Sequence, residues 1–275
     1  MMSIIEKAEA LEQIISDVDN IAVALSGGID SLVLSSICFA VSQKSAVNCT
    51  MFHAVSAAVP EQATARVLEC AEQFKWNVRL VDANEFADPN YRENPVDRCF
   101  YCKSALYGTI RSATDAVIVS GTNKDDLLEF RPGLKAAKTY GVRHPFVEAD
   151  VTKQMIRELA PLYGISQYSD LPAAPCLASR VETGISIEPD ELKSINAIEL
   201  FISEKYSCRT VRCRLRNGKV VIEIDEKSLP EVSSNIRQNE SIEHEIRSLL
   251  ANRFKSHPLD VTAYRTGSAF LQAAK

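Results

Sequence analysis

Residues 21–31, IAVALSGGIDS, decide the fold of this chain. An apolar run ends at Ser-Gly-Gly, and Asp-Ser then opens a second apolar run, LVLSSICFA, which predicts a buried strand, a glycine turn and a helix N-terminus in succession. Backbone N–H groups and the helix dipole favour an anion at such a turn, and glycines without a Cβ let it approach the main chain. The Walker pattern with its lysine is absent. We predict a phosphate-binding turn formed by Ser26, Gly27, Gly28, Asp30 and Ser31.

Strand and helix patterns alternate after this turn. Apolar segments typical of strands lie at 21–25, 49–55, 78–82 and 116–121, and helical patterns lie at 30–42, 61–75 and 103–113. This alternation predicts an α/β fold with a parallel sheet and right-handed crossovers. Ligands of such sheets bind beyond the carboxyl ends of the strands. We therefore expect the loop at 120–123, which contains Gly121, to face the same crevice as the glycine turn.

The composition changes between residues 170 and 184, DLPAAPCLASRVETG, where small residues and prolines predict a loop or linker. A helix is predicted beyond it at about 188–205. The segment TVRCRLRNGKVVIEID then predicts a β-hairpin, because alternating residues flank Asn217 and Gly218. We predict two domains, a parallel-sheet domain at 1–170 and a small α/β domain at 171–275.

Composition narrows the class of protein. With 275 residues and 46% hydrophobic content, the chain has the composition of a globular protein with a sizeable core. No apolar run approaches the length of a membrane span, and the start MMSIIEKAEALEQ carries charges where a signal peptide needs an apolar stretch. We expect a cytoplasmic protein without a membrane partner. The net charge of −5 disfavours a broad nucleic-acid surface.

The eight cysteines of a cytoplasmic chain favour metal binding or catalysis over structural disulfides. Cys99 and Cys102 form CFYC at the start of a helix, and Cys176 lies in a loop that can fold back over the crevice. Three thiolates can hold a [4Fe–4S] cluster with one open iron, or zinc with a fourth ligand from elsewhere. The alternative is a pair of incidental or redox-active thiols. Core positions are expected for Cys38, Cys49 and Cys70.

Two arginines, Arg212 and Arg214, alternate along a predicted strand, so their side chains emerge on one face. Their forked donors suit a phosphate or a carboxylate group. Glu223 on the return strand is the alternative partner, in an internal ion pair.

A third polar cluster occurs in GTNKDDLLEFRPGLKAA, which follows the fourth predicted strand. Here the carboxylates of Asp125 and Asp126 can reach Mg²⁺ on a triphosphate, and Arg131 can reach a phosphate oxygen. A solvated run of surface charges is the alternative interpretation.

Several of these segments together resemble one family. IAVALSGGIDS, NPVDRCFYCK, GTNKDDLLEFRPGLKAA, VRHPF, APCLASR and TVRCRLRNGKVVIEID occur in the order found in the LarE family of ATP-dependent pyridinium-3,5-biscarboxylic acid mononucleotide sulfurtransferases. SGGxDS itself resembles the PP-loop of ATP pyrophosphatases. The resemblance spans about residues 20 to 225 and implies a PP-loop, adenine nucleotide α-hydrolase-like domain.

The resemblance also implies an activity. Family members adenylate a carboxylate of a nicotinate-derived mononucleotide and convert it to a thiocarboxylate in the biosynthesis of the nickel-pincer nucleotide. One type gives up the sulfur of its PCLASR cysteine, and the other holds a [4Fe–4S] cluster on three cysteines and uses sulfide bound to its open iron. Because Cys99, Cys102 and Cys176 are all present, we expect the cluster-dependent type, in which Cys176 is a ligand or the attacking sulfur.

The remaining roles follow from this expectation. Mg²⁺ and ATP are expected at the glycine turn, with Asp30 and Asp125 as metal ligands. Arg212 and Arg214 are expected to hold the phosphate of the pyridinium mononucleotide, and Glu199 and Glu223 are further candidates in that pocket. Family members form homo-oligomers, often hexamers, and the same is expected here.

Two other functions stay open. One is a [4Fe–4S]-dependent PP-loop tRNA thiolase, which the acidic net charge and the lack of zinc-ribbon CxxC pairs disfavour. The other is an ATP-regulated iron–sulfur or metal carrier without acyl chemistry. The sequence does not identify the sulfide donor.

Overall fold

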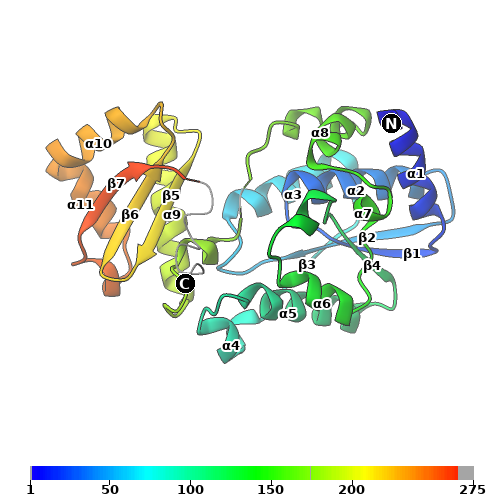
Figure 1. Cartoon of the computed structure of the whole chain (residues 1–275), viewed down its shortest axis with the longest axis horizontal. Helices are drawn as coiled ribbons and strands as arrows, with labels where there is room; N and C mark the ends of the chain where they lie inside the picture. The colour runs from blue at the N-terminus through cyan, green and yellow to red at the C-terminus, as the bar shows by residue number, and fades with distance from the viewer. Residues whose placement is uncertain (1, 174, 266–275) are drawn as a thin grey trace. The chain divides into compact units, whose positions relative to one another are not determined.

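The computed structural model describes residues 2–173 and 175–265 (Figure 1). The chain separates into two compact units. Unit 1 comprises Met1–Glu85 and Asp97–Ala174, and unit 2 comprises Phe86–Val96 and Pro175–Lys275. The two domains predicted at 1–170 and 171–275 stay a prediction. Ala174, inside the predicted linker, lies outside the described residues.

A parallel four-stranded sheet in the order β3-β2-β1-β4 forms the centre of unit 1 (Figure 1). Its strands are β1 (Asn20–Ala24), β2 (Asn48–Ala54), β3 (Val78–Val81) and β4 (Val117–Ser120). Each strand agrees with its predicted segment to within one residue at either end. The predicted α/β class with a parallel sheet is therefore confirmed, whereas the PP-loop assignment is not observed directly.

Helices cover both faces of this sheet. They are α1 (Ile4–Ser16), α2 (Ile29–Ser42), α3 (Glu61–Phe74), α5 (Arg98–Ala113), α6 (Gly133–Thr139), α7 (Pro145–Glu148) and α8 (Lys153–Leu162). Unit 1 also contains the single turns η2 (Asp125–Leu128) and η3 (Ser166–Tyr168), and η1 (Glu85–Ala87) begins at the last residue of its first segment. The predictions for α2 and α3 are confirmed. Helix α5 begins at Arg98 rather than at residue 103, so CFYC forms its first turn.

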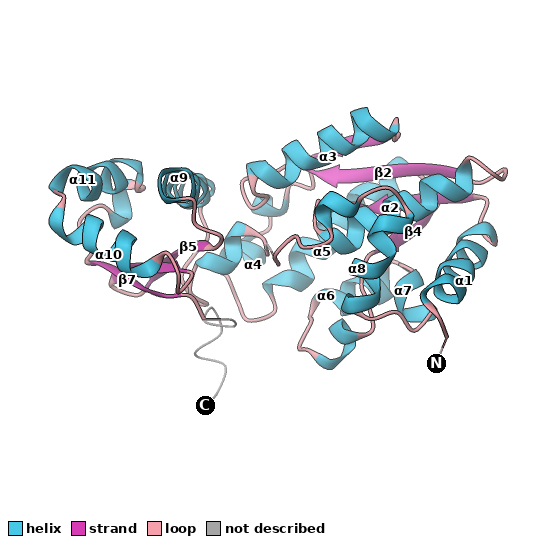
Figure 2. Cartoon of the chain, turned by 90° about the horizontal axis from the view of Figure 1, so that it is seen from above, coloured by secondary structure: helices cyan, strands magenta, loops and turns pink. Residues whose placement is uncertain are grey.

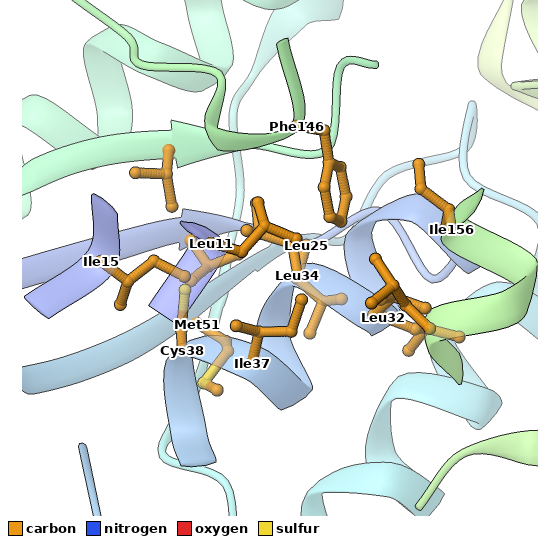
Figure 3. Packing of buried hydrophobic residues seen from close by; sticks show 14 of the residues in the cluster. Leu11, Ile15, Leu25, Leu32, Leu34, Ile37, Cys38, Met51, Phe146 and Ile156 are labelled. Carbon is orange, nitrogen blue, oxygen red and sulfur yellow. The ribbon is translucent and has the colours of Figure 1, made fainter. Parts of the chain in front are cut away.

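The sequence of strand β1 is apolar without interruption because both of its faces are buried. Ile21 and Val23 join a buried cluster with residues of α1, α2, α3, α7 and α8, part of which Figure 3 shows. The alternate residues Ala22 and Ala24 join a second cluster with residues of α5 and α6. Since successive strand residues point to opposite faces, a strand covered on both sides is apolar throughout.

Unit 2 contains a three-stranded sheet in the order β5-β6-β7. Its elements are β5 (Val211–Arg216), β6 (Lys219–Ile224), β7 (Leu259–Ala263), α4 (Pro89–Arg92), α9 (Pro189–Tyr206), α10 (Leu229–Gln238), α11 (Glu240–Leu249), η4 (Leu177–Arg180) and η5 (Asn252–Phe254). Helices α9 and α10 pack on this sheet, and α11 contacts both of these helices (Figure 2). The predicted helix at 188–205 is confirmed as α9.

The predicted hairpin is confirmed as the antiparallel pair β5 and β6, in which Gly218 has a φ of +77°. The region beyond residue 225, to which the sequence analysis assigned no role, supplies β7 in a parallel pairing with β6. None of the helices within the described ranges is long and apolar enough to cross a bilayer.

Candidate functional site

The turn between β1 and α2 has the conformation that its glycines predict. Gly27 has a φ of +78°, and a Cβ at this position would lie 2.7 Å from the backbone oxygen of Ala63. Arg66 holds the turn by donating from Nη1 to the Gly27 oxygen at 2.7 Å. A residue with a side chain therefore does not fit at position 27 without moving the backbone of α3.

Two serines fix the other side of the turn. Ser31 Oγ donates to the Gly28 oxygen at 3.0 Å, and the Ser26 backbone N–H donates to Ser31 Oγ at 3.1 Å. Gly28 is the N-cap of α2 and provides no side-chain cap for the N–H groups of the first turn. A helix N-terminus without a side-chain cap is suited to an anionic ligand, because its N–H groups and the helix dipole favour negative charge.

The carboxyl end of β4 lies against this helix N-terminus. A Cβ at Gly121 would lie 2.8 Å from the carbonyl carbon of Asp30 and 2.8 Å from the nitrogen of Ser31. The strand order reverses between β1 and β4, since β2 and β3 lie on one side of β1 and β4 lies on the other. In open parallel sheets, ligands bind at the carboxyl ends of the strands at such a reversal. The structure thus brings the loop at 120–123 beside the glycine turn.

Lys153, the first residue of α8, connects the two carboxylates predicted to hold Mg²⁺. Its Nζ lies 2.8 and 2.6 Å from the two carboxylate oxygens of Asp30, and its backbone N–H donates to Asp125 Oδ2 at 2.7 Å. Sequence analysis did not identify this lysine. One signal was available. A positive charge at the first position of a helix is unfavourable with respect to the helix dipole, so a lysine there indicates a nearby negative partner.

Asp126 and Arg131 form an ion pair with each other. Arg131 Nη2 lies 2.6 Å from Asp126 Oδ1 and 2.9 Å from Glu129 Oε2. Burial raises the pKa of the Asp126 carboxyl, against the opposing effects of the Asn123 N–H and the Arg131 guanidinium. The expected contact of Arg131 with a phosphate stays a prediction.

The three cysteines of the predicted cluster divide between the units. Cys99 and Cys102 lie in the first turn of α5, three residues apart and therefore on one side of the helix, and both are half-buried. Cys176 is half-buried in unit 2, directly before η4. Within 2–173 and 175–265, no three His, Cys, Asp or Glu side chains form a metal-binding group. The convergence of the three thiols stays a prediction.

The expected core cysteines behave as predicted. Cys38 and Cys70 are fully buried in the larger hydrophobic cluster, and Cys49 is partly buried against it.

Arg214 is held inside unit 2 by Glu223. Its Nε donates to Glu223 Oε2 at 2.8 Å and its Nη1 donates to the Ser179 oxygen at 3.1 Å. Arg214 is 6% exposed and Glu223 3% exposed, and Arg216 Nη2 also reaches Glu223 Oε1 at 3.3 Å. The internal ion pair, which the sequence left open, is thus what the structure contains at Arg214.

Arg212 has different surroundings on the same strand. Its guanidinium carbon lies 5.8 Å from the centre of the Tyr264 ring, and its Nη1 donates to the Val211 oxygen at 2.7 Å. Burial lowers the pKa of Arg212, and the nearby positive charge of Arg180 lowers it further. The negative charge of Glu199 acts in the opposite direction.

Glu199, a further candidate, lies on α9 and accepts hydrogen bonds from Arg180 and from the backbone of β5. Arg180 Nε and Nη2 donate to its two carboxylate oxygens at 3.0 and 3.1 Å, and the Cys213 N–H donates to Oε1 at 2.9 Å. Arg180 belongs to the APCLASR segment, but no role was predicted for it from the sequence. The signal was its position four residues after Cys176.

We compared the sequence with protein-family models and with known proteins. No family model matches the chain. It is 26% identical over 271 residues to the LarE-type pyridinium-3,5-bisthiocarboxylic acid mononucleotide synthase of Lactiplantibacillus plantarum, covering 97% of this chain and 95% of that enzyme. It is 28% identical over 250 residues to the uncharacterized protein MJ0830 of Methanocaldococcus jannaschii, covering 90% and 91% of the two chains.

A higher identity is found with the uncharacterized protein slr1717 of Synechocystis sp. The two chains are 31% identical over 268 residues, which cover 95% of this chain and 96% of that protein. The alignment therefore covers most of both units. The chain belongs to the same family as the Synechocystis protein slr1717.

Proposed function

We propose that this protein is an ATP-dependent sulfurtransferase that adenylates a carboxylate of pyridinium-3,5-biscarboxylic acid mononucleotide and converts it to a thiocarboxylate in nickel-pincer nucleotide biosynthesis. The observation that carries the proposal is the Gly27 turn at the strand reversal, which suits a nucleotide phosphate. The similarity to the Lactiplantibacillus enzyme over most of both chains supports the choice of substrate.

The nucleotide end of the reaction uses the turn and Lys153. A carboxylate oxygen of the substrate attacks the α-phosphorus of ATP, and pyrophosphate leaves. Backbone N–H groups at the start of α2 stabilise the charge on the phosphate oxygens. Lys153 contacts both Asp30 and Asp125, so the two carboxylates lie near each other. Both are suited to Mg²⁺, because magnesium prefers oxygen ligands. On binding, Lys153 exchanges Asp30 for a phosphate oxygen.

The sulfur end uses the three cysteines. Cys99 and Cys102 fit as a pair of ligands, because a spacing of three residues in the first turn of α5 puts both thiols on one side of the helix. Cys176 would be the third ligand. A [4Fe–4S] cluster held there would supply the sulfur that displaces AMP from the activated carboxylate.

The substrate phosphate is assigned to Arg212 rather than equally to both arginines. Arg212 lies on β5 close to the positive charge of Arg180, and the forked donors of a guanidinium suit a phosphate group. Arg214, already paired with Glu223, would keep β5 in place beside it. Binding of the substrate phosphate would then orient the reacting carboxylate, which lies elsewhere in the same substrate molecule.

The test is to incubate the protein anaerobically with ATP and pyridinium-3,5-biscarboxylic acid mononucleotide and to measure the amount of each product. We expect AMP and pyrophosphate in equal amounts, and a product in which sulfur replaces one carboxylate oxygen by mass spectrometry. Cys99→Ala is expected to abolish repeated turnover. Pyrophosphate release without the pyridinium substrate, or repeated turnover by Cys99→Ala, would contradict the proposal or its cluster-dependent form respectively.

A further inference from the structure

Arg180 is buried in unit 2 and is 2% exposed. Among the described residues, its hydrogen bonds go to the turn that carries Cys176 and to α9. Its Nη1 donates to the backbone oxygens of Pro175 at 2.6 Å and Cys176 at 3.1 Å, and to Ser179 Oγ at 3.1 Å. Its Nε and Nη2 bind the two oxygens of Glu199 in a bidentate arrangement.

The backbone of Cys176 is consequently held from several directions. Its carbonyl oxygen accepts from the Ser179 N–H at 3.0 Å, from Ser179 Oγ at 2.8 Å and from Arg180 Nη1 at 3.1 Å. The residue itself is only half-buried. The main chain at Cys176 is thus fixed, while the residue as a whole stays partly exposed.

Glu199 anchors this arrangement to the rest of unit 2. Its Oε1 also accepts the Cys213 N–H from the middle of β5, so the same carboxylate ties the turn to a helix and to a strand. A buried ion pair is costly to form unless its hydrogen bonds are satisfied, and apolar residues can hold a loop as firmly. A planar guanidinium differs from apolar packing because its five donors fix directions as well as distances.

We propose that Arg180 is a positioning residue for Cys176: the guanidinium, held by Glu199, fixes the backbone from which the Cys176 thiol is presented. Glu199 then acts through Arg180 and does not contact the substrate. This inference rests on the proposed function in so far as Cys176 takes part in sulfur transfer. The structural claim concerns Cys176 alone and is measurable without turnover.

The test compares Arg180→Lys with Arg253→Lys in the full-length protein. Arg253 is a matched control, because it also pairs with a glutamate of α9, Glu191, at 3.2 Å, but does not contact the Cys176 turn. The first readout is alkylation of Cys176 by iodoacetamide, followed in the tryptic peptide 158–180, whose only cysteine is Cys176. We expect about tenfold faster alkylation in Arg180→Lys than in the control, because charge-assisted bonds to the turn are lost.

The second readout separates positioning from stability. In the sulfur-transfer assay we expect kcat to fall about tenfold or more in Arg180→Lys, because a displaced reacting group slows the chemical step. KM for ATP and for the mononucleotide should stay within about twofold, because lysine keeps the positive charge beside Arg212 and the nucleotide turn is unchanged. Thermal unfolding of both variants shows whether a general loss of stability accounts for the change.

Equal alkylation rates of Cys176 in the two variants would overturn the inference. So would a fall in kcat that is accompanied by a matching rise in KM and a matching loss of stability. If Arg180→Lys does not fold, Glu199→Gln replaces it, since the amide retains the size of the carboxylate and weakens its hold on Arg180. Unchanged alkylation in Glu199→Gln would then overturn the inference. Failure of the proposed function gives a different result: selective alkylation with no thiocarboxylate product from the unmodified protein.

Discussion

The glycine turn of unit 1 and the arginine cluster of unit 2 are built in opposite ways. The turn presents backbone N–H groups, and its shape depends on the absence of a side chain at Gly27. The cluster consists of long charged side chains, Arg180, Arg214, Glu199 and Glu223, that bind one another. A backbone site follows from a short sequence pattern, whereas a site made of charges depends on which charges pair. Mutations can test whether the two regions differ in this way.

The largest effect is expected in the cluster, from Glu223→Ala. This change leaves Arg214 buried without its carboxylate, and loss of one partner of a buried pair costs about 3–5 kcal/mol of unfolding free energy. Urea unfolding of the full chain measures it. The control is Asp260→Ala, which breaks the exposed pair with Lys219 in the same sheet and should cost about 0–1 kcal/mol. Similar costs for both variants would mean that the Glu223 pair is not buried as described.

The turn should be broken next most strongly by Gly27→Ala. A positive φ and a Cβ 2.7 Å from the Ala63 oxygen together should cost about 2–4 kcal/mol. Gly28→Ala is the matched control, because its Cβ would meet only Ser26 Oγ at 3.6 Å. We expect the control to keep wild-type stability to within about 1 kcal/mol. Thermal unfolding compares them, and a greater loss in Gly28→Ala would refute this account of the turn.

A smaller effect, on ligand binding, is expected from Lys153→Gln. Loss of a charge-assisted bond to a phosphate should weaken ATP binding about tenfold or more. Calorimetric titration with ATP and Mg²⁺ measures the change. Lys124→Gln serves as control, because Lys124 pairs with the exposed Asp150 and not with Asp30. ATP affinity that is the same in both variants would remove Lys153 from the nucleotide site.

The smallest effect is a pH dependence at His53, which joins β2 to the residue before the turn. Its Nδ1 donates to the Leu25 oxygen at 2.8 Å, and Thr64 Oγ1 lies 2.9 Å from Nε2. Burial lowers the pKa of His53 from 6.5, so the folded state favours the neutral ring. Its contribution to stability is therefore present above pH 6.5 and is lost as the pH falls from 6.5 through the lower folded-state pKa.

The variant His53→Gln should reduce this dependence. We expect a shallower loss of stability below pH 6.5 than in the unmodified protein, measured by urea unfolding across that range. His144, whose pKa burial also lowers, remains in the variant and accounts for a residual slope. An identical slope in both proteins would assign the whole pH dependence to other groups.

Local patterns determined the parts of this protein whose shape depends on neighbouring residues. The apolar run before Ser26 predicted β1, Gly27 and Gly28 predicted the turn, and Asn217 with Gly218 predicted the hairpin. Strand periodicity and the positive φ of glycine are properties of a few consecutive residues, so a sequence displays them directly.

Only the tertiary structure decided which distant groups meet. Lys153 reaches Asp30 across more than a hundred residues, Arg214 pairs with Glu223, and Arg180 pairs with Glu199. The structure likewise assigned Phe86–Val96 to unit 2 and paired β7 with β6. The physical reason is that a charged side chain can pair with any opposite charge within reach, and the packing of the whole chain determines which one lies there.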